Sequence, residues 1–190
     1  MFVLAHLSDL HYTPLPDIKF LQLCNKRLLG YSNFYFKRRH QYNNKNFQHL
    51  MEDLKKHTPD HVVISGDIVN FSLPQEFVQA RQWLQQQGDP QDISLTLGNH
   101  DCYVLGAYKK ACKAFLPWLA EKNEPAPLLF PSLRQRGCVA LINVCSALAM
   151  PPFFAAGYFS PEAEKRLRII LRQCKEKKLF RVIFLHHPPL

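Results

Sequence analysis

Several features are scarce or missing in this 190-residue sequence, and each absence argues against a class of protein. No run of about 18 consecutive apolar residues occurs, so we expect no membrane-spanning helix. The N-terminus carries no basic side chain and reaches Asp9 early, so we expect no secretory signal. The six cysteines contain no Cys-x-x-Cys spacing, which favours reduced thiols in a cytoplasmic protein over a disulfide framework or a zinc knuckle.

Acidic residues are absent from one long segment. Residues 19–47 hold seven of the 24 Lys and Arg and no Asp or Glu, in a chain whose formal net charge is +9. A local basic excess favours an anionic partner such as a phosphate, a nucleic acid or a membrane surface. A solvated basic face has the same composition, so the charge alone does not decide between these interpretations.

The apolar pattern alternates between strands and helices. Short runs rich in Val, Ile and Phe predict strands at residues 2–7, 61–65, 93–97, 138–144 and 180–185. Apolar spacing and capping residues predict helices around residues 47–54, 74–88, 105–120 and 161–178. This order is typical of an α/β domain, and the continuous apolar strands indicate a sheet covered on both faces.

Residues 12–46 fit this scheme least well. We interpret them as an insertion with a helix at residues 18–29, followed by an irregular loop rich in aromatic and basic residues. A long insertion beside a site often forms a lid or binds substrate. Arg38 and Arg39 are the candidate substrate-binding residues within it.

Polar residues typical of metal sites follow four of the predicted strands. Asp9 and His11 follow the first strand, Asp67 the second, Asn99 the third and His186 the last. Ligands bind beyond the carboxyl ends of the strands in open α/β sheets, so these residues predict one shared site.

The spacing of these residues suits a cation site. Asp9 and His11 lie two residues apart, so in an extended chain both side chains would point the same way and could hold one cation. Asp67 follows Gly66, which permits a tight turn, and its two oxygens could bridge two cations. Mixed nitrogen and oxygen ligands without thiolate suit manganese, iron or zinc.

The order of these motifs resembles that of the calcineurin-like metallophosphoesterase superfamily, most closely a small bacterial branch related to cyclic-nucleotide phosphodiesterases. The resemblance covers residues 2–190 and implies a four-layer α-β-β-α sandwich. The family's later Gly-His-x-His motif does not occur. We therefore expect residues 1–190 to be the N-terminal part of a longer metallophosphoesterase domain, with an incomplete second sheet and impaired activity on its own.

The resemblance also implies a role for each site residue. The first metal ion would be held by Asp9, His11 and Asp67, and the second by Asp67, Asn99 and His186. These two ions would activate a bridging hydroxide that attacks a phosphodiester or phosphomonoester.

Three residues beside the ligands complete the expected site. By the same resemblance, His100 would contact the phosphoryl or leaving-group oxygen, and Asp101 would orient the His100 imidazole. His187 is either a residue at the edge of the core or a substrate contact. Away from the site, His61 resembles a surface residue.

Three functions remain open on the sequence alone. The first is hydrolysis of a phosphodiester or phosphomonoester. The second is hydrolysis of a lipid-linked nucleotide pyrophosphate such as UDP-2,3-diacylglucosamine, which the basic and aromatic insertion favours, with peripheral contact at the inner membrane surface. The third is a non-catalytic module that binds anions or a membrane through residues 19–47. No groove signature is evident, which disfavours nucleic acid.

Overall fold

Two three-stranded sheets lie face to face in the computed structural model, which describes residues 1–190 except 13–14, 39–43, 122–129, 153, 155 and 190. The first sheet holds β1 (Leu4–Leu7), β2 (His61–Ile64) and β3 (Ile93–Leu95), all parallel and in that order. Its three carboxyl ends therefore meet at one edge, as the sequence predicted.

The second sheet mixes strand directions. It consists of β4 (Ser132–Arg136), β5 (Val139–Asn143) and β6 (Phe180–Phe184). Strands β4 and β5 pair antiparallel, whereas β5 and β6 pair parallel through a helical crossover. Strand β6 forms one edge, where Phe180 is 69% and Ile183 is 44% exposed. That the second sheet is incomplete stays a prediction.

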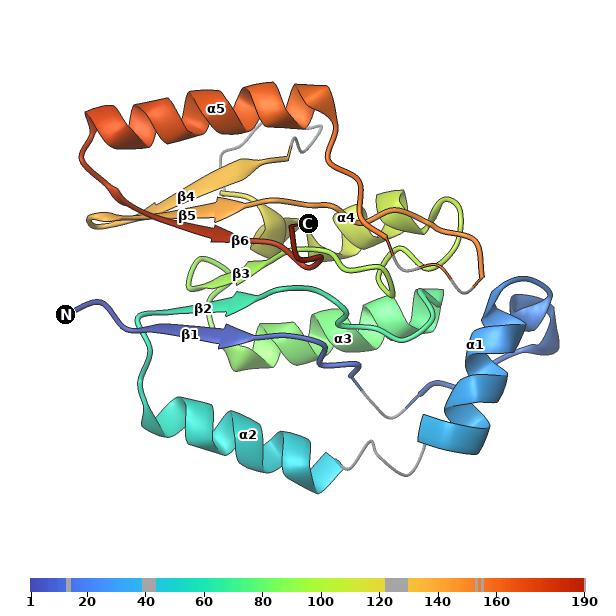
Figure 1. The fold of residues 1–190 in the computed structure, drawn as a ribbon. Coiled ribbons are helices and arrows are strands. Elements are labelled where there is room, and N and C mark those ends of the chain that lie inside the picture. The colour runs from blue at the N-terminus through green and yellow to red at the C-terminus, as the bar shows by residue number, and fades with distance from the viewer. Residues whose placement is uncertain (13–14, 39–43, 122–129, 153, 155, 190) are drawn as a thin grey trace.

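Helices cover the outer face of each sheet (Figure 1). Helices α2 (Asn44–Lys56) and α3 (Pro74–Gln87) lie over the first sheet, and α4 (Ala107–Leu119) packs against β3 and α3. Helix α5 (Pro161–Glu176) lies over the second sheet and begins as predicted, because the Ser160 hydroxyl accepts the N–H of Ala163. The α/β class and the order of layers agree with the expected sandwich.

Each interface between layers has its own apolar core. Val63, Leu141 and Phe184 pack between the two sheets. Helix α5 packs Ile170 against Ile142 of β5. The largest cluster lies under α2, α3 and α4 and includes Trp118. These contacts fix the strands that carry the site loops. Among the described residues, no helix has the length and apolarity needed to cross a bilayer.

The structure differs from the predicted elements in two places. Strand β4 was missed because it is polar, and because its Arg134 is buried through hydrogen bonds to the carbonyl oxygens of Ile93 (2.7 Å) and Ala120 (2.6 Å). The insertion does not form one helix at residues 18–29. It forms a short 3-10 helix, α1 and a π-helical turn, with bounds Phe20–Leu23, Arg27–Asn33 and Phe34–Arg38.

Candidate metal centre

The loops after β1 and β2 run side by side beyond the sheet edge. The backbone N–H of Asp9 donates to the carbonyl of Gly66 (3.1 Å), and the N–H of His11 donates to that of Asp67 (2.9 Å). Asp9, His11 and Asp67 have φ angles of 54°, 43° and 54°, in the left-handed region. The extended conformation expected for Asp9 and His11 is therefore wrong. Tight turns, not strand alternation, direct these side chains.

Two glycines let the loop after β2 and the loop after β3 touch. Gly66 has a φ of 96°, and a Cβ there would lie 2.7 Å from the backbone nitrogen of Gly98 and 2.9 Å from the His186 Nδ1. A Cβ on Gly98 would lie 2.6 Å from the backbone nitrogen of Asp67 and closer still to its Oδ1. A side chain at position 66 would therefore clash with Gly98 and His186, and one at position 98 would clash with Asp67.

A buried carboxylate holds these two loops together. Asp101 is fully buried and accepts backbone N–H groups from Asp67 (2.8 Å), Ile68 (3.0 Å), Val69 (3.1 Å) and Gly98 (2.9 Å). Burial and the charge of Asp67 raise the pKa of Asp101 to about 7, against the opposing effect of these N–H groups. Asp101 thus fixes the backbone beneath the cluster.

A second buried carboxylate continues the same pattern along the chain. Glu76, in the first turn of α3, accepts the backbone N–H groups of Asn70 (2.9 Å), Phe71 (3.0 Å) and Leu73 (2.9 Å). Burial raises the pKa of Glu76, although these same N–H groups lower it. Two carboxylates from other elements therefore hold the backbone of the loop that carries Asp67.

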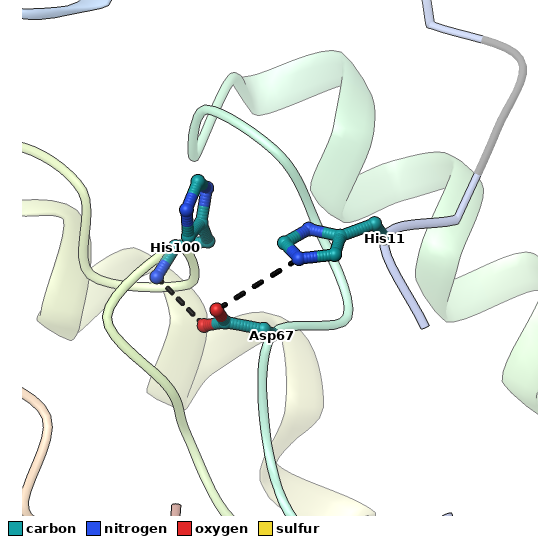
Figure 2. Close-up of side chains that lie close together, drawn as sticks. All are labelled: His11, Asp67 and His100. Carbon is teal, nitrogen blue, oxygen red and sulfur yellow. Dashed lines mark hydrogen bonds and ion pairs between the residues drawn. The ribbon is translucent and has the colours of Figure 1, made fainter. Parts of the chain in front are cut away.

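His100 is oriented differently from the expectation. Its Nδ1 lies 2.5 Å from the backbone carbonyl of Asn70, which can only accept, so Nδ1 carries the proton. The expected contact between Asp101 and this imidazole is therefore wrong, because the Asp101 oxygens already accept four backbone N–H groups. The backbone N–H of His100 donates to Asp67 Oδ1 (2.7 Å, Figure 2), and its ring stacks on Tyr103.

The carboxylate of Asp67 lies at the centre of the predicted cluster. Its Oδ2 lies 4.0 Å from His11 Nε2 (Figure 2) and 3.5 Å from His186 Nε2. The same His186 nitrogen is 3.1 Å from Asn99 Oδ1, while its Nδ1 bonds the carbonyl of Ser65. Side chains from four loops and both sheets therefore meet around one carboxylate.

These side chains form two groups with metal-ligand spacing. Asp67 lies with His11 and His100 in one group, and with Asp9 and His186 in the other. The ligand atoms of each group lie within 4.8 Å of one another. This grouping differs from the one that the resemblance implied, because it separates Asp9 from His11 and includes His100. Imidazole nitrogens and carboxylate oxygens suit manganese, iron or zinc, so the donor set fits the expected metals.

The pKa values of the two histidines beside Asp67, His11 and His186, shift in opposite directions. Burial would lower the pKa of His186, but the hydrogen bond and charge of Asp67 outweigh it and raise that pKa to about 9. Burial lowers the pKa of His11, and the nearby His100 lowers it further. Burial would raise the pKa of Asp67, but its histidine neighbours lower it overall. The cluster thus places anionic and imidazole ligands together in a largely buried site.

The structure gives partial information on the other candidate residues. His187 lies edge-on to His186, and its Nδ1 is 2.8 Å from the Ser146 hydroxyl. Of Arg38 the structure describes the backbone, and Arg39 lies outside the described residues. Tyr103 is not among the predicted site residues, and its place four residues after Asn99 is the signal that indicates it.

The insertion reaches the same edge of the sheet. Helix α1 lies beyond the carboxyl ends of β1 and β2 (Figure 1). The Arg27 guanidinium donates to the carbonyls of Phe71 (2.7 Å) and Ser72 (2.8 Å), and the Lys26 ammonium donates to that of Met150 (2.9 Å). Among the side chains of the insertion that the structure describes, Lys26 and Arg27 are therefore basic residues held at this edge.

The fold, the interlocked loops and the Asp67 cluster point to one family. The sequence model of the calcineurin-like phosphoesterases matches residues 2–190, and the chain belongs to that family. It is similar to the glycerophosphodiester phosphodiesterase GpdQ of Enterobacter lignolyticus (strain SCF1), with 28% identity over 193 residues. This alignment covers 99% of the chain and 57% of the relative, so the chain spans little more than half of that protein's length.

Proposed function

We propose that the protein hydrolyses phosphodiesters at a dinuclear metal centre built around Asp67. The observation that carries this proposal is that the Asp67 carboxylate is common to both ligand groups. A carboxylate common to two ligand groups can offer one oxygen to each of two cations, as a two-metal site would use. The relative's name, glycerophosphodiester phosphodiesterase, favours a diester over a monoester.

The proposed ligands are the residues gathered around that carboxylate. Asp9, His11, Asn99 and His186 would hold the metal ions together with Asp67. Bound ions would supply Lewis-acid activation of water and of the phosphoryl oxygens. Asp101 and Glu76 act as positioning residues, since they hold the backbone of the Asp67 loop.

His100 is the proposed contact to the leaving group. Its Nδ1 proton is held by the Asn70 carbonyl, which fixes the ring and leaves Nε2 as the nitrogen that can exchange a proton. Protonated at Nε2, the imidazole would donate to the leaving oxygen as the P–O bond breaks and the water oxygen adds to phosphorus. Stacking on Tyr103 holds the ring in this orientation.

The test is metal-dependent hydrolysis by the protein purified from its full-length gene, because we expect residues 1–190 alone to have impaired activity. We expect Mn(II) to support cleavage of bis(p-nitrophenyl) phosphate in preference to p-nitrophenyl phosphate, and a chelator to abolish it. Asp67→Asn should remove the activity, whereas Asp53→Asn, on an exposed side chain of α2, should leave it unchanged. Hydrolysis that persists in Asp67→Asn, or no hydrolysis with manganese, iron or zinc, would contradict the proposal.

A second candidate function adds a lipid-linked substrate. The observation that favours it is a group of exposed apolar side chains on the insertion, which we call the apolar face: Phe20, Leu21, Leu28, Leu29, Tyr35 and Phe36. Phe20 and Leu21 are 78% and 82% exposed. Exposed apolar side chains beside Lys and Arg are typical of segments that lie on an anionic lipid surface.

Vesicle sedimentation tests this membrane contact. We expect the protein to bind phosphatidylglycerol vesicles and to bind phosphatidylcholine vesicles weakly, because anionic lipid attracts the basic segment. Leu21→Ser should reduce binding, and Leu116→Ser, on a 46% exposed leucine of α4, serves as the matched control. Equal loss in both variants, or no vesicle binding at low salt, would contradict the lipid-surface interpretation.

A further inference from the structure

A cavity of about 580 Å³ lies next to the candidate metal centre, on the Tyr103 side. Its wall combines apolar side chains such as Met150 and Pro151 with three cationic ones, Lys26, Arg27 and Lys110. Among the described residues that line it, none carries a carboxylate. A concave site with an apolar wall and several cations suits an organic anion.

Lys26 is the cation best placed to bind a ligand there. Its ammonium lies 4.3 Å from the centre of the Tyr103 ring and donates one hydrogen bond, to the Met150 carbonyl. An ammonium has three N–H donors, so two remain for a ligand. Burial lowers the pKa of Lys26, since no carboxylate among the described lining residues offsets its charge.

The cavity is connected to the proposed leaving-group contact through Tyr103. The Tyr103 and His100 rings stack with centroids 5.2 Å apart and an interplanar angle of 29°. The Ser72 hydroxyl, also on the cavity wall, donates to the His100 carbonyl (2.7 Å) and accepts the N–H of Tyr103 (2.8 Å). Two residues of the cavity wall, Ser72 and Tyr103, therefore contact His100 directly.

We propose that the cavity binds an anionic group on the leaving half of the substrate, with Lys26 as the specificity-determining residue. The proposal rests on the proposed function, because it takes His100 as the leaving-group contact. It predicts that the enzyme prefers esters whose leaving alcohol carries a further negative charge. The apolar wall would pack against the organic part of that alcohol.

A matched pair of substrates tests this preference. Methyl 4-carboxyphenyl phosphate and methyl 4-(methoxycarbonyl)phenyl phosphate have similar phenol leaving groups. Only the first carries a carboxylate on the ring of its leaving group. We expect kcat/KM to be about tenfold higher for the carboxylate, the scale of one charge-assisted hydrogen bond. Lys26→Gln should remove this preference, because it should lower kcat/KM for the carboxylate ester more than for the neutral ester. Lys26→Arg should retain most of it.

Matched controls separate a local effect from a change in net charge. Lys109→Gln, on an exposed side chain of α4 outside the cavity, should leave the preference intact, whereas Lys110→Gln should reduce it. Equal rates for the two substrates in the wild type, or equal slowing of both by Lys26→Gln, would overturn the proposal.

Binding provides a readout that does not depend on catalysis. We expect the carboxylate substrate to bind more tightly than the neutral one in titration calorimetry without metal, and Lys26→Gln to abolish the difference. If neither substrate is hydrolysed but this difference persists, the proposed function fails and the cavity assignment stands. If the two bind equally, the cavity assignment fails whatever the activity.

Discussion

The loop that carries Asp67 and the insertion that lies beside it are built in opposite ways. In the loop, successive backbone N–H groups are bound by two buried carboxylates, Asp101 and Glu76. On the insertion, large apolar side chains face solvent, and Leu21 is 82% exposed. The difference shows that buried acceptors fix the backbone of the loop, whereas the insertion leaves apolar side chains at the surface.

The largest effect on metal binding and hydrolysis should come from adding a side chain between the loops that follow β2 and β3. Gly98→Ala places a Cβ 2.6 Å from the Asp67 nitrogen. Overpacking of this kind typically costs about 1–3 kcal/mol, and displacing a ligand by about 1 Å can reduce activity about 10²-fold. We expect loss of bound metal by elemental analysis and loss of hydrolysis.

Gly137→Ala is the matched control for that variant. Gly137 has a φ of 55°, and a Cβ there would have no other atom within 4 Å, so alanine adds backbone strain without a clash. We expect it to lower the free energy of unfolding by about 1 kcal/mol and to leave metal content unchanged. Equal losses of metal in the two variants would show that the close approach of the loops is not what matters.

The next largest effect should separate His100 from Asn99. His100→Ala should retain metal and lower kcat by about 10²–10⁴-fold, with a smaller loss for a p-nitrophenolate leaving group, which needs less proton donation. Asn99→Ala should instead lower metal content. Metal analysis and kcat for two leaving groups distinguish a proton donor from a metal ligand. If His100→Ala strips the metal, its place beside His11 and Asp67 makes it a ligand.

A pH effect on stability should follow from His61 at the start of β2. Burial, with the charges of Arg134 and Arg136, lowers the pKa of His61 to about 3. The unfolded chain takes up this proton near its ordinary pKa of 6.5 and the folded chain only near 3, so acid favours unfolding between those values. The free energy of unfolding should fall by about 1.4 kcal/mol per pH unit in that window from this group.

Urea unfolding at pH 7 and pH 5 measures that slope. His61→Gln cannot titrate and should show a shallower fall than the wild type. His57→Gln, on a side chain that is 73% exposed, should keep the wild-type slope. Identical slopes in all three proteins would contradict the assignment.

The smallest effect should be on the apolar face of the insertion. Leu21→Ser should change the free energy of unfolding by less than about 0.5 kcal/mol, as is usual at exposed positions, and should not affect hydrolysis of a small water-soluble ester. Leu84→Ser, at a fully buried position of α3, should cost about 2–5 kcal/mol. A large destabilisation by Leu21→Ser would show that the apolar face packs within the protein and is not available to a partner.

The framework was predictable from sequence because its signals are local. The first three strands are short apolar runs, each followed by a polar motif, and their common edge follows from parallel pairing. Bringing Asp67 and Asn99 together required only that rule, whereas His186 follows β6 of the second sheet. Strand β4 was not predictable, because the hydrogen bonds that bury Arg134 come from residues far away in the sequence.

The predictions that were wrong also depend on contacts with residues far away in the sequence. The sequence predicts His61 at the surface, yet His61 is fully buried with its Nε2 2.9 Å from the Ser94 hydroxyl. The helix expected at residues 18–29 is interrupted where Lys26 and Arg27 bind carbonyls of distant loops. The conformation of Asp9 and His11 depends on their backbone hydrogen bonds to the loop after β2. The spacing of residues within one segment cannot predict these bonds.

The two buried carboxylates also have a consequence for how the site opens. The amides of Asp67, Ile68 and Val69 share one acceptor residue, and those of Asn70, Phe71 and Leu73 share the other. Releasing either carboxylate frees three donors of this loop at once, so opening only part of the loop costs almost as much free energy as opening the whole block. Hydrogen exchange at these amides should therefore occur in two cooperative blocks rather than residue by residue from a frayed end.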